Sequence, residues 1–434
     1  MKKIFITLLL LCATWCGAKN LPDDVRAIRN YISNVMPQSV RTALTDGNGV
    51  LALPKPYSVP CIRGAFQEMY YWDTYFTNIG LISLGDKEQA LNNIDDILYL
   101  INKYGFMPNA SNIGLQNRSQ PPYASLMVRD LYHVTSDKKW LASAVKTLEK
   151  EYHFWMTKRI APNGLNRYGH SATDDELVGF YDAIASRLRI KGDDMKTSRE
   201  DKIAVGGNWL AEAESGWDFN PRYNQHCLDF NPVDLNSNLY IYEKNFAYFY
   251  QQLGWKGASK WLKLAAKRKA LIVRYCYNAK NGLFYDYDFV NHRLSTVLSG
   301  GIFNLMGAGI LTSRQAVRVK NGALSKLEME YGIVACEKGT RKITYQWDFP
   351  NVWVPVTYMA IKGLDNYGYK VDARRIASKY LESNLKQYKQ TGVLWEKYNA
   401  VTGNNDAASE YATPGQFMGW TAGIILFTID FLYK

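Results

Sequence analysis

The segment Glu88–Lys103, EQALNNIDDILYLINK, carries one of the clearest patterns in the chain. Its apolar residues recur every three or four positions, which places them on one face of an α-helix. These residues are Ala90, Leu91, Ile94, Ile97, Leu98 and Ile101. The pattern therefore predicts an amphipathic helix with one face turned toward a core.

The same period recurs along most of the chain, and alternating strand patterns are few. Further helices are predicted at Leu235–Leu253, Ser259–Cys276, Ser313–Tyr331 and Val371–Leu385. The best candidates for strands are Leu283–Val290 and Lys342–Gln346, where β-branched and aromatic residues are frequent. We therefore predict an all-α fold.

The connections between the predicted helices alternate between two kinds. Short turns contain glycine, as in Leu84-Gly85-Asp86, whereas the long connections are dense in polar and aromatic residues. This alternation is typical of a ring of paired helices, with tight turns on one face and functional loops on the other.

Composition places the chain among globular proteins. It has 434 residues, of which 47% are hydrophobic and 21% charged, enough for a large buried core. Aromatic residues make up 14%, with 12 Trp and 31 Tyr, and so many rings also suit a groove that stacks against sugars. The net charge of +12 leaves a polyanion-binding protein as one alternative. Because Lys and Arg are scattered, we expect a solvated basic surface and no nucleic-acid partner.

The N-terminus predicts a secretory signal peptide at residues 1–18, followed by a single domain at 19–434. Two lysines precede the apolar run Ile4–Leu11, and small residues follow at the expected cleavage site. The run is too short for a permanent membrane anchor. We expect export to the periplasm or the medium; a lipid anchor on Cys12 or Cys16 is the less favoured route.

The remaining cysteines and the histidines give no sign of metal or thiol chemistry. Cys61, Cys227, Cys276 and Cys336 lie far apart, so one or two disulfides and four buried thiols are both compatible with the sequence. The five histidines have no metal-ligand spacing, and phosphate loops, HExxH and GxSxG motifs are absent. We expect no metal and no cofactor, which leaves chemistry based on carboxylates.

The stretch Ala213–Arg222, AESGWDFNPR, places the carboxylate of Asp218 between Trp217 and Phe219. A glycine and a proline bracket the carboxylate, so a loop is predicted. Aromatic neighbours lower the local dielectric and raise the pKa of a carboxyl group, as a general acid requires. The alternative is a buried aspartate that caps a helix.

Trp is followed directly by Asp at three places, residues 72–73, 217–218 and 347–348, each at a predicted junction between a loop and a helix. Each pair alone has an ordinary structural explanation. Together they favour a sugar site, because C–H faces of a pyranose stack on aromatic rings while its hydroxyl groups donate to carboxylates.

Read in order, the loops resemble the α,α-trehalases of glycoside hydrolase family thirty-seven over nearly the whole mature chain. The resemblance is carried by FQEMYYWD at 66–73, GFMPN at 105–109, NRSQPP at 117–122, GLNRY at 164–168, ESGWDF at 214–219, PVDLN at 232–236, GLFYDYD at 282–288, QWDFPN at 346–351 and EKY at 396–398. It implies an (α/α)6 toroid of six helical hairpins and an inverting glucosidase. We therefore predict a monomeric, metal-independent enzyme that hydrolyses trehalose to two glucose molecules.

The resemblance also implies roles for individual residues. Asp218 matches the family's general acid and Glu410 its general base, which in an inverting pair stand roughly 6.5–9.5 Å apart. The positions expected to contact substrate are Phe66, Trp72, Asp73, Asn109, Arg118, Gln120, Gly216, Trp217, Arg222, Trp347, Asp348, Glu396 and Trp420.

Three segments depart from the family pattern. Ala65 stands where an arginine is expected, and Arg63 is a candidate replacement. The family's Arg-Pro-Glu-Ser-Tyr segment is replaced by His170–Glu176, and its glycine-rich lid by Asn404–Ser409. These changes leave open which second sugar is accepted. Two alternatives follow: an enzyme for another α-linked glucoside, and an inactive sugar-binding protein, which would have no need of both catalytic carboxylates.

Overall fold

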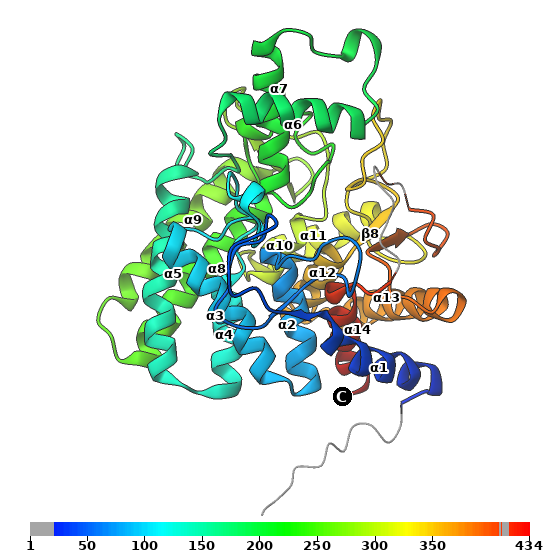
Figure 1. Ribbon diagram of the computed structural model, residues 1–434. Helices are drawn as coiled ribbons and strands as arrows, with labels where there is room; N and C mark the ends of the chain where they lie inside the picture. Colours follow the sequence, from blue (N-terminus) through cyan, green and yellow to red (C-terminus); the bar gives the residue numbers. More distant parts are fainter. Residues whose placement is uncertain (1–20, 408, 410–415) are drawn as a thin grey trace, which may run out of the picture.

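The computed structural model describes residues 21–407, 409 and 416–434 (Figure 1). The predicted signal peptide at 1–18 and the predicted base Glu410 lie outside these residues.

Six helices form a closed inner ring, in which each helix packs on the next and the last packs on the first. In ring order they are α2 (Tyr71–Leu84), α4 (Ala124–Thr135), α8 (Val233–Leu253), α10 (Ile302–Gly307), α12 (Val354–Asn366) and α14 (Gly419–Tyr433). Most of their side chains are buried, because these helices have neighbours on both sides and a second layer outside them.

Six further helices pack against the outside of the ring (Figure 1). They are α1 (Asp23–Val35), α3 (Lys87–Tyr104), α5 (Lys138–Lys158), α9 (Ala258–Cys276), α11 (Ser313–Leu327) and α13 (Lys370–Thr391). α3 packs on α2 and α4, α5 on α4 and α8, α9 on α8, α11 on α10, α13 on α12 and α14, and α1 on α14. The predicted all-α class and the (α/α)6 toroid are confirmed.

The helix predicted at Glu88–Lys103 is confirmed as α3. The carboxylate of Asp86 accepts a hydrogen bond from the Gln89 N–H at its start, and Gly105, with φ of 81°, ends it. The apolar stripe is buried, with Ile94 and Ile101 almost fully covered. The predicted helices at 235–253, 259–276 and 371–385 are likewise found, as α8, α9 and α13.

The predicted helix Ser313–Tyr331 is too long, since α11 ends at Leu327. Glu328 is extended and forms a β-bridge with Ile333. Its carboxylate accepts hydrogen bonds from Arg375 and Lys379 of the neighbouring α13. Tertiary ion pairs therefore end the helix where the apolar period alone would continue it.

The hairpin of α6 (Asp174–Arg187) and α7 (Arg199–Glu214) stands out from the ring at the top of Figure 1. α6 begins with a capping box, in which the Thr173 hydroxyl accepts from the Glu176 N–H and the Glu176 carboxylate accepts from the Thr173 N–H. The hairpin turns through the short 3₁₀ helix Gly192–Asp194.

The strands are short and pair antiparallel in small sheets. They are β1 (Val40–Arg41) with β2 (Tyr57–Ser58), β3 (Phe230–Asn231) with β6 (Tyr287–Asp288) and β7 (Arg293–Leu294), β4 (Tyr277–Asn278) with β5 (Leu283–Phe284), and β8 (Asn351–Trp353) with β9 (Lys397–Asn399). The predicted strand Leu283–Val290 is therefore two strands in different sheets. Three further 3₁₀ helices lie at Met36–Ser39, Ile113–Leu115 and Cys227–Asp229.

The predicted strand Lys342–Gln346 is wrong. No neighbouring strand pairs with it among the described residues; instead, the Gln346 carbonyl accepts hydrogen bonds from the side chains of Asn351 and Trp353. Side-chain donors thus satisfy the backbone in place of a ladder.

The sequence left open either disulfides or four buried thiols. The structure contains the thiols: Cys61, Cys227, Cys276 and Cys336 are all buried and free. None of the described helices combines the length and apolarity needed to cross a membrane.

Candidate active site

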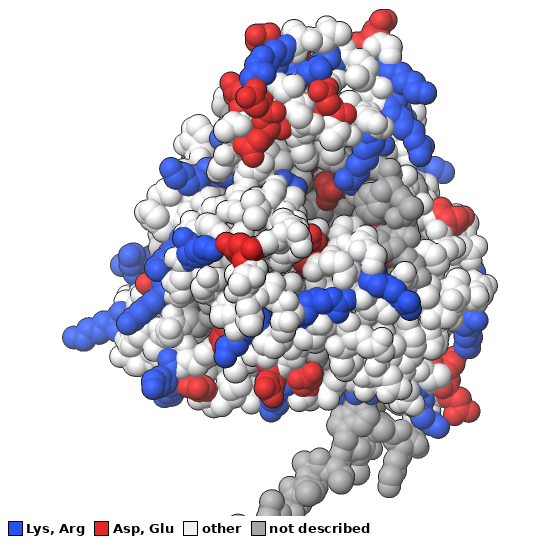
Figure 2. Space-filling model, viewed as in Figure 1, with Lys and Arg blue, Asp and Glu red and all other residues white. Residues whose placement is uncertain are grey.

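A cavity of about 210 Å³ lies where α2, α12 and α14 begin, at one end of the inner ring. It is lined by Phe66, Tyr70, Trp72, Asp73, Asn109, Leu115, Arg118, Gln120, Arg187, Ala213, Gly216, Asp218, Gln346, Trp347, Trp353, Glu396, Met418 and Trp420. We call it the catalytic cavity. Figure 2 shows the face of the molecule in which a hollow containing acidic side chains lies below the α6–α7 hairpin.

Five tryptophans form a continuous aromatic wall beside this cavity. Trp347 stacks on Trp353 with ring centroids 3.8 Å apart, and on Trp217 at 5.0 Å. Trp72 contacts Trp347 at 5.6 Å and Trp420 at 5.9 Å. The tryptophans of the three Trp–Asp pairs, far apart in the sequence, are thus brought into one cluster, whose rings can pack against a sugar face.

The Asp218 loop is set by the close approach of its backbone to this wall. Residues 213 and 214 are still helical, so the loop predicted at 213–222 begins two residues later, where α7 ends. Gly216 has φ of 71°, and a Cβ there would lie 2.7 Å from ring atoms of Trp72. Only glycine fits both the backbone conformation and the space.

Glu214 connects the end of α7 to two other loops. Arg159 donates to both of its carboxylate oxygens, at 2.7 and 2.9 Å. The backbone N–H groups of Ser119 and Gly169 donate to the same two oxygens, at 2.8 and 2.7 Å. The carboxylate is fully buried and fully satisfied, which marks it as a structural anchor of the site.

The 109–120 loop presents polar groups to the cavity in fixed positions. The Gln120 side-chain oxygen accepts from the Trp72 N–H at 3.1 Å, and Gln120 lines the cavity. Asn109 donates to the Ser119 carbonyl at 2.9 Å. The Arg118 guanidinium lies over the Phe180 ring, 5.6 Å from its centroid, and attracts the negative charge of Asp218.

Asp218 lines the cavity with its side chain 33% exposed and paired to Arg187 of α6 at 3.2 Å. Burial raises the pKa of the Asp218 carboxyl, while the positive charge of Arg187 opposes this rise. The carboxylate therefore pairs with an arginine across the cavity and does not serve as a helix cap. These surroundings keep a proton on Asp218 at higher pH than in water.

Two other carboxylates face the same space. Burial, with the negative charge of Glu396 as the second cause, raises the pKa of Asp73 to about 8. Glu396 itself accepts a hydrogen bond from the buried ammonium of Lys397 at 2.6 Å. A protonated Asp73 can donate to a sugar hydroxyl, while the side-chain oxygens of Glu396 can accept from one.

Ten of the thirteen predicted substrate contacts line the catalytic cavity, together with Asp218; Trp217, Arg222 and Asp348 do not. Trp217 packs behind Trp347 as part of the aromatic wall. Arg222 is buried and donates to Asp234 and Asp286, and Asp348 accepts from Arg341.

Sequence reasoning missed Trp353, which belongs to the aromatic wall, and Arg187, which lines the cavity beside Asp218. Arg187 belongs to the α6 segment, which has no counterpart among the quoted motifs, and its ion pair with Asp218 links it to the site. Arg63, the candidate replacement for the expected arginine, is exposed and does not line the cavity. Of the His170–Glu176 segment, Glu176 is used in the capping box of α6.

Comparison with known proteins shows the family of this chain. The family model described as Trehalase matches residues 17–433. Trehalase of Tenebrio molitor is 30% identical over 415 residues, covering 87% of this chain and 73% of that protein. Periplasmic trehalase of Escherichia coli O1:K1 / APEC is 28% identical over 436 residues, covering 96% and 76%.

Solved structures agree with the fold. Neutral trehalase Nth1 from Saccharomyces cerevisiae has a TM-score of 0.75 at 25% identity, covering 93% of this chain and 80% of that one. A GH63 mannosylglycerate hydrolase from Thermus thermophilus, in complex with glucose, has a TM-score of 0.64 at 17% identity, covering 92% and 99%. The second likeness concerns the fold alone.

Proposed function

This chain belongs to the trehalase family and is an inverting glycoside hydrolase that splits trehalose into two glucose molecules; we propose that Asp218 is its general acid. The observation that carries the proposal is the position of Asp218. It lines the catalytic cavity beside the tryptophan wall, and burial raises its pKa.

The proposed reaction uses two carboxylates on opposite sides of the bond. One glucose lies in the catalytic cavity, with its C–H faces on the aromatic wall. Asp218 gives its proton to the bridging oxygen while Glu410 takes a proton from the attacking water. Support for Glu410 comes from its match to the family pattern, since it lies outside the described residues.

The neighbouring groups bind and orient the reacting sugar. Asp73 and Glu396 exchange hydrogen bonds with its hydroxyl groups, and the amide nitrogen of Gln120 donates to another. Arg187 acts as a positioning residue, because its ion pair fixes the rotamer of Asp218 without contacting the reacting atoms itself.

We also propose that the protein is exported after removal of residues 1–18, and that 19–434 form one catalytic domain. The apolar N-terminal run and the periplasmic relatives support export. The family match over 17–433 and the closed ring of helices support a single domain.

Glucose release from trehalose by the purified mature chain tests this function, with maltose, kojibiose and nigerose alongside. We expect trehalose to be cleaved, with one α-glucose and one β-glucose seen initially by NMR. Cleavage of another α-glucoside in place of trehalose would show that the enzyme has a different substrate. Binding of sugars without any hydrolysis would contradict the proposed enzymatic activity.

A further inference from the structure

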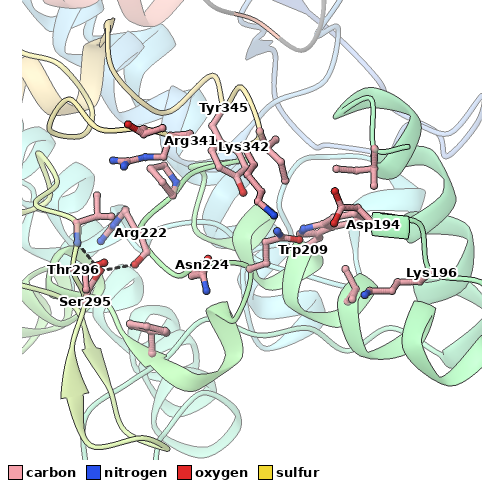
Figure 3. A pocket seen from close by; sticks show the side chains of 18 of the residues that line it. Asp194, Lys196, Trp209, Arg222, Asn224, Ser295, Thr296, Arg341, Lys342 and Tyr345 are labelled. Atoms are coloured by element: carbon pink, nitrogen blue, oxygen red, sulfur yellow. Dashed lines mark hydrogen bonds between the residues drawn. The ribbon is translucent and has the colours of Figure 1, made fainter. Parts of the chain in front are cut away.

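Two more cavities lie next to the catalytic cavity, and residues from the turn of the α6–α7 hairpin line both of them. The first, of about 340 Å³, shares Arg187 with the catalytic cavity, and we call it the adjoining cavity. The second, of about 590 Å³, shares Ile190, Asp194, Lys342 and Ile343 with the adjoining cavity (Figure 3). Because neighbouring cavities share lining residues, the three lie side by side in a row, with Arg187 between the first two.

Positive charge dominates the described lining of the adjoining cavity, whereas the catalytic cavity is lined by three carboxylates and two arginines. Among the described residues, Arg187, Arg189, Lys191 and Lys342 line the adjoining cavity together with one carboxylate, that of Asp194. Lys342 extends from its loop into the larger cavity, toward the side where Asp194 is drawn in Figure 3. Blue side chains also gather on the upper right of the face in Figure 2.

Most of these cations have no carboxylate partner. Within the described part of the chain, no ion pair within 4 Å is formed by Arg189, Lys191 or Lys342. By contrast, Arg341 and Arg293 of the larger cavity pair with Asp348 and Asp288. Like charges held around a concave surface raise its positive potential and attract anions.

The position of this potential matters for the leaving sugar. The catalytic cavity, at about 210 Å³, is smaller than the roughly 300–1,000 Å³ typical of small-molecule sites, and we place one sugar ring in it. The general acid must stand at the bond between the two sugars. The second sugar therefore continues past Asp218 and Arg187, toward the adjoining cavity.

We propose that the adjoining cavity binds an anionic group carried by the leaving sugar, a phosphate monoester or a carboxylate. This inference rests on the proposed function and adds charged α,α-linked disaccharides to its substrates. The chemistry is the same hydrolysis: the anomeric C–O bond breaks and a C–O bond to water forms. One proton passes from Asp218 to the bridging oxygen, another from water to the base, and the anionic group leaves unchanged.

The first test compares kcat/KM of the mature enzyme on trehalose, trehalose 6-phosphate and the 6-carboxylate of trehalose. At low ionic strength we expect at least one charged substrate to exceed trehalose by about tenfold, and the excess to shrink as salt screens the charges. Preference for one of the two identifies the anion. Equal or lower values for both charged substrates would overturn the inference.

Variants then locate the effect. Lys342→Gln and Arg189→Gln should each lower the ratio of charged to neutral kcat/KM by about threefold or more, whereas Asp194→Asn should raise it. Lys263→Gln removes the same charge from the exposed face of α9 and should leave the ratio unchanged. An unchanged ratio in all three cavity variants would contradict the assigned site.

The two proposals fail differently. If none of the three disaccharides is hydrolysed, the proposed function is wrong. If trehalose is hydrolysed and neither charged substrate is preferred, the proposed function stands and only the anion site is wrong.

Discussion

The end of α7 and the loop that follows it place two carboxylates four residues apart in opposite settings. Glu214, at the helix end, is fully buried and bound by Arg159 and two backbone N–H groups. Asp218, in the loop, is one-third exposed, and it pairs with Arg187 through a single contact. The carboxylate at the helix end is held in place by these hydrogen bonds, whereas the carboxyl group in the loop remains available to a ligand.

This difference teaches how one segment serves both structure and chemistry. A buried carboxylate that is fully bonded cannot give up its place without leaving charges unpaired, so it suits an anchor. A carboxyl group whose pKa is raised by burial, yet reached by solvent, suits proton transfer. Gly216 separates the two by letting the backbone turn against Trp72.

Asp218→Asn should give the largest effect of the four variants, and it should reduce activity far more than stability. Loss of general acid catalysis should lower kcat on trehalose about 10²- to 10⁴-fold. Because the lost ion pair is partly exposed, stability should change by about 1 kcal/mol or less. Steady-state kinetics and urea unfolding check both parts; an active variant would contradict the role of the acid.

Glu214→Gln should reverse that pattern. The amide cannot accept from Arg159 and both N–H groups at once, so the free energy of unfolding should fall by about 3–5 kcal/mol. Urea unfolding measures this loss. A variant as stable as the wild type would break the distinction between anchor and acid.

Gly216→Ala should have a smaller effect, of about 1–3 kcal/mol, through strain and a shifted Trp72. Gly85→Ala is the matched control, because φ there is 87° and nothing lies within 4 Å of the added Cβ. We expect the affinity for trehalose to fall only in the first variant, measured as KM at equal folded concentration. Equal effects in both would mean that backbone strain alone matters.

Arg187→Gln should give the smallest change and test the electrostatics of the loop. Arg187 favours the ionised form of Asp218, so its removal raises the pKa of the acid further. The acid then keeps its proton to higher pH, and the alkaline limb of kcat/KM should move to higher pH. The rate at the optimum should fall roughly fivefold or less. An alkaline limb that moves to lower pH would contradict the expected rise in the pKa of Asp218.

Much of the fold is predictable because the helices obey one strong rule, an apolar face with a period near 3.6. The rule succeeds for α3, α8, α9 and α13. It overextends α11, where ion pairs of Glu328 with α13 take over. The strand pattern, in turn, misassigns 342–346, because the side chains that bond its backbone lie further along the chain.

The site is predictable only as far as its motifs reach. Repeated Trp–Asp pairs indicate a sugar cavity, but nothing in the sequence says that Asp348 turns to Arg341 while Asp73 and Asp218 face the cavity. Arg187 is invisible for another reason: it lies in a helix without a motif, and its contact with Asp218 is purely tertiary.

The central claim, that Asp218 delivers the proton to the leaving oxygen, is tested most directly by the leaving group. α-Glucosyl fluoride needs little help from an acid, because fluoride leaves as a stable anion, whereas the sugar oxygen of trehalose must be protonated. The measurement is the ratio of kcat/KM on the fluoride to that on trehalose, in the wild type and in Asp218→Asn. We predict that the variant retains most activity on the fluoride and loses it on trehalose, so the ratio rises at least about 10²-fold. Equal losses on both substrates would contradict the account.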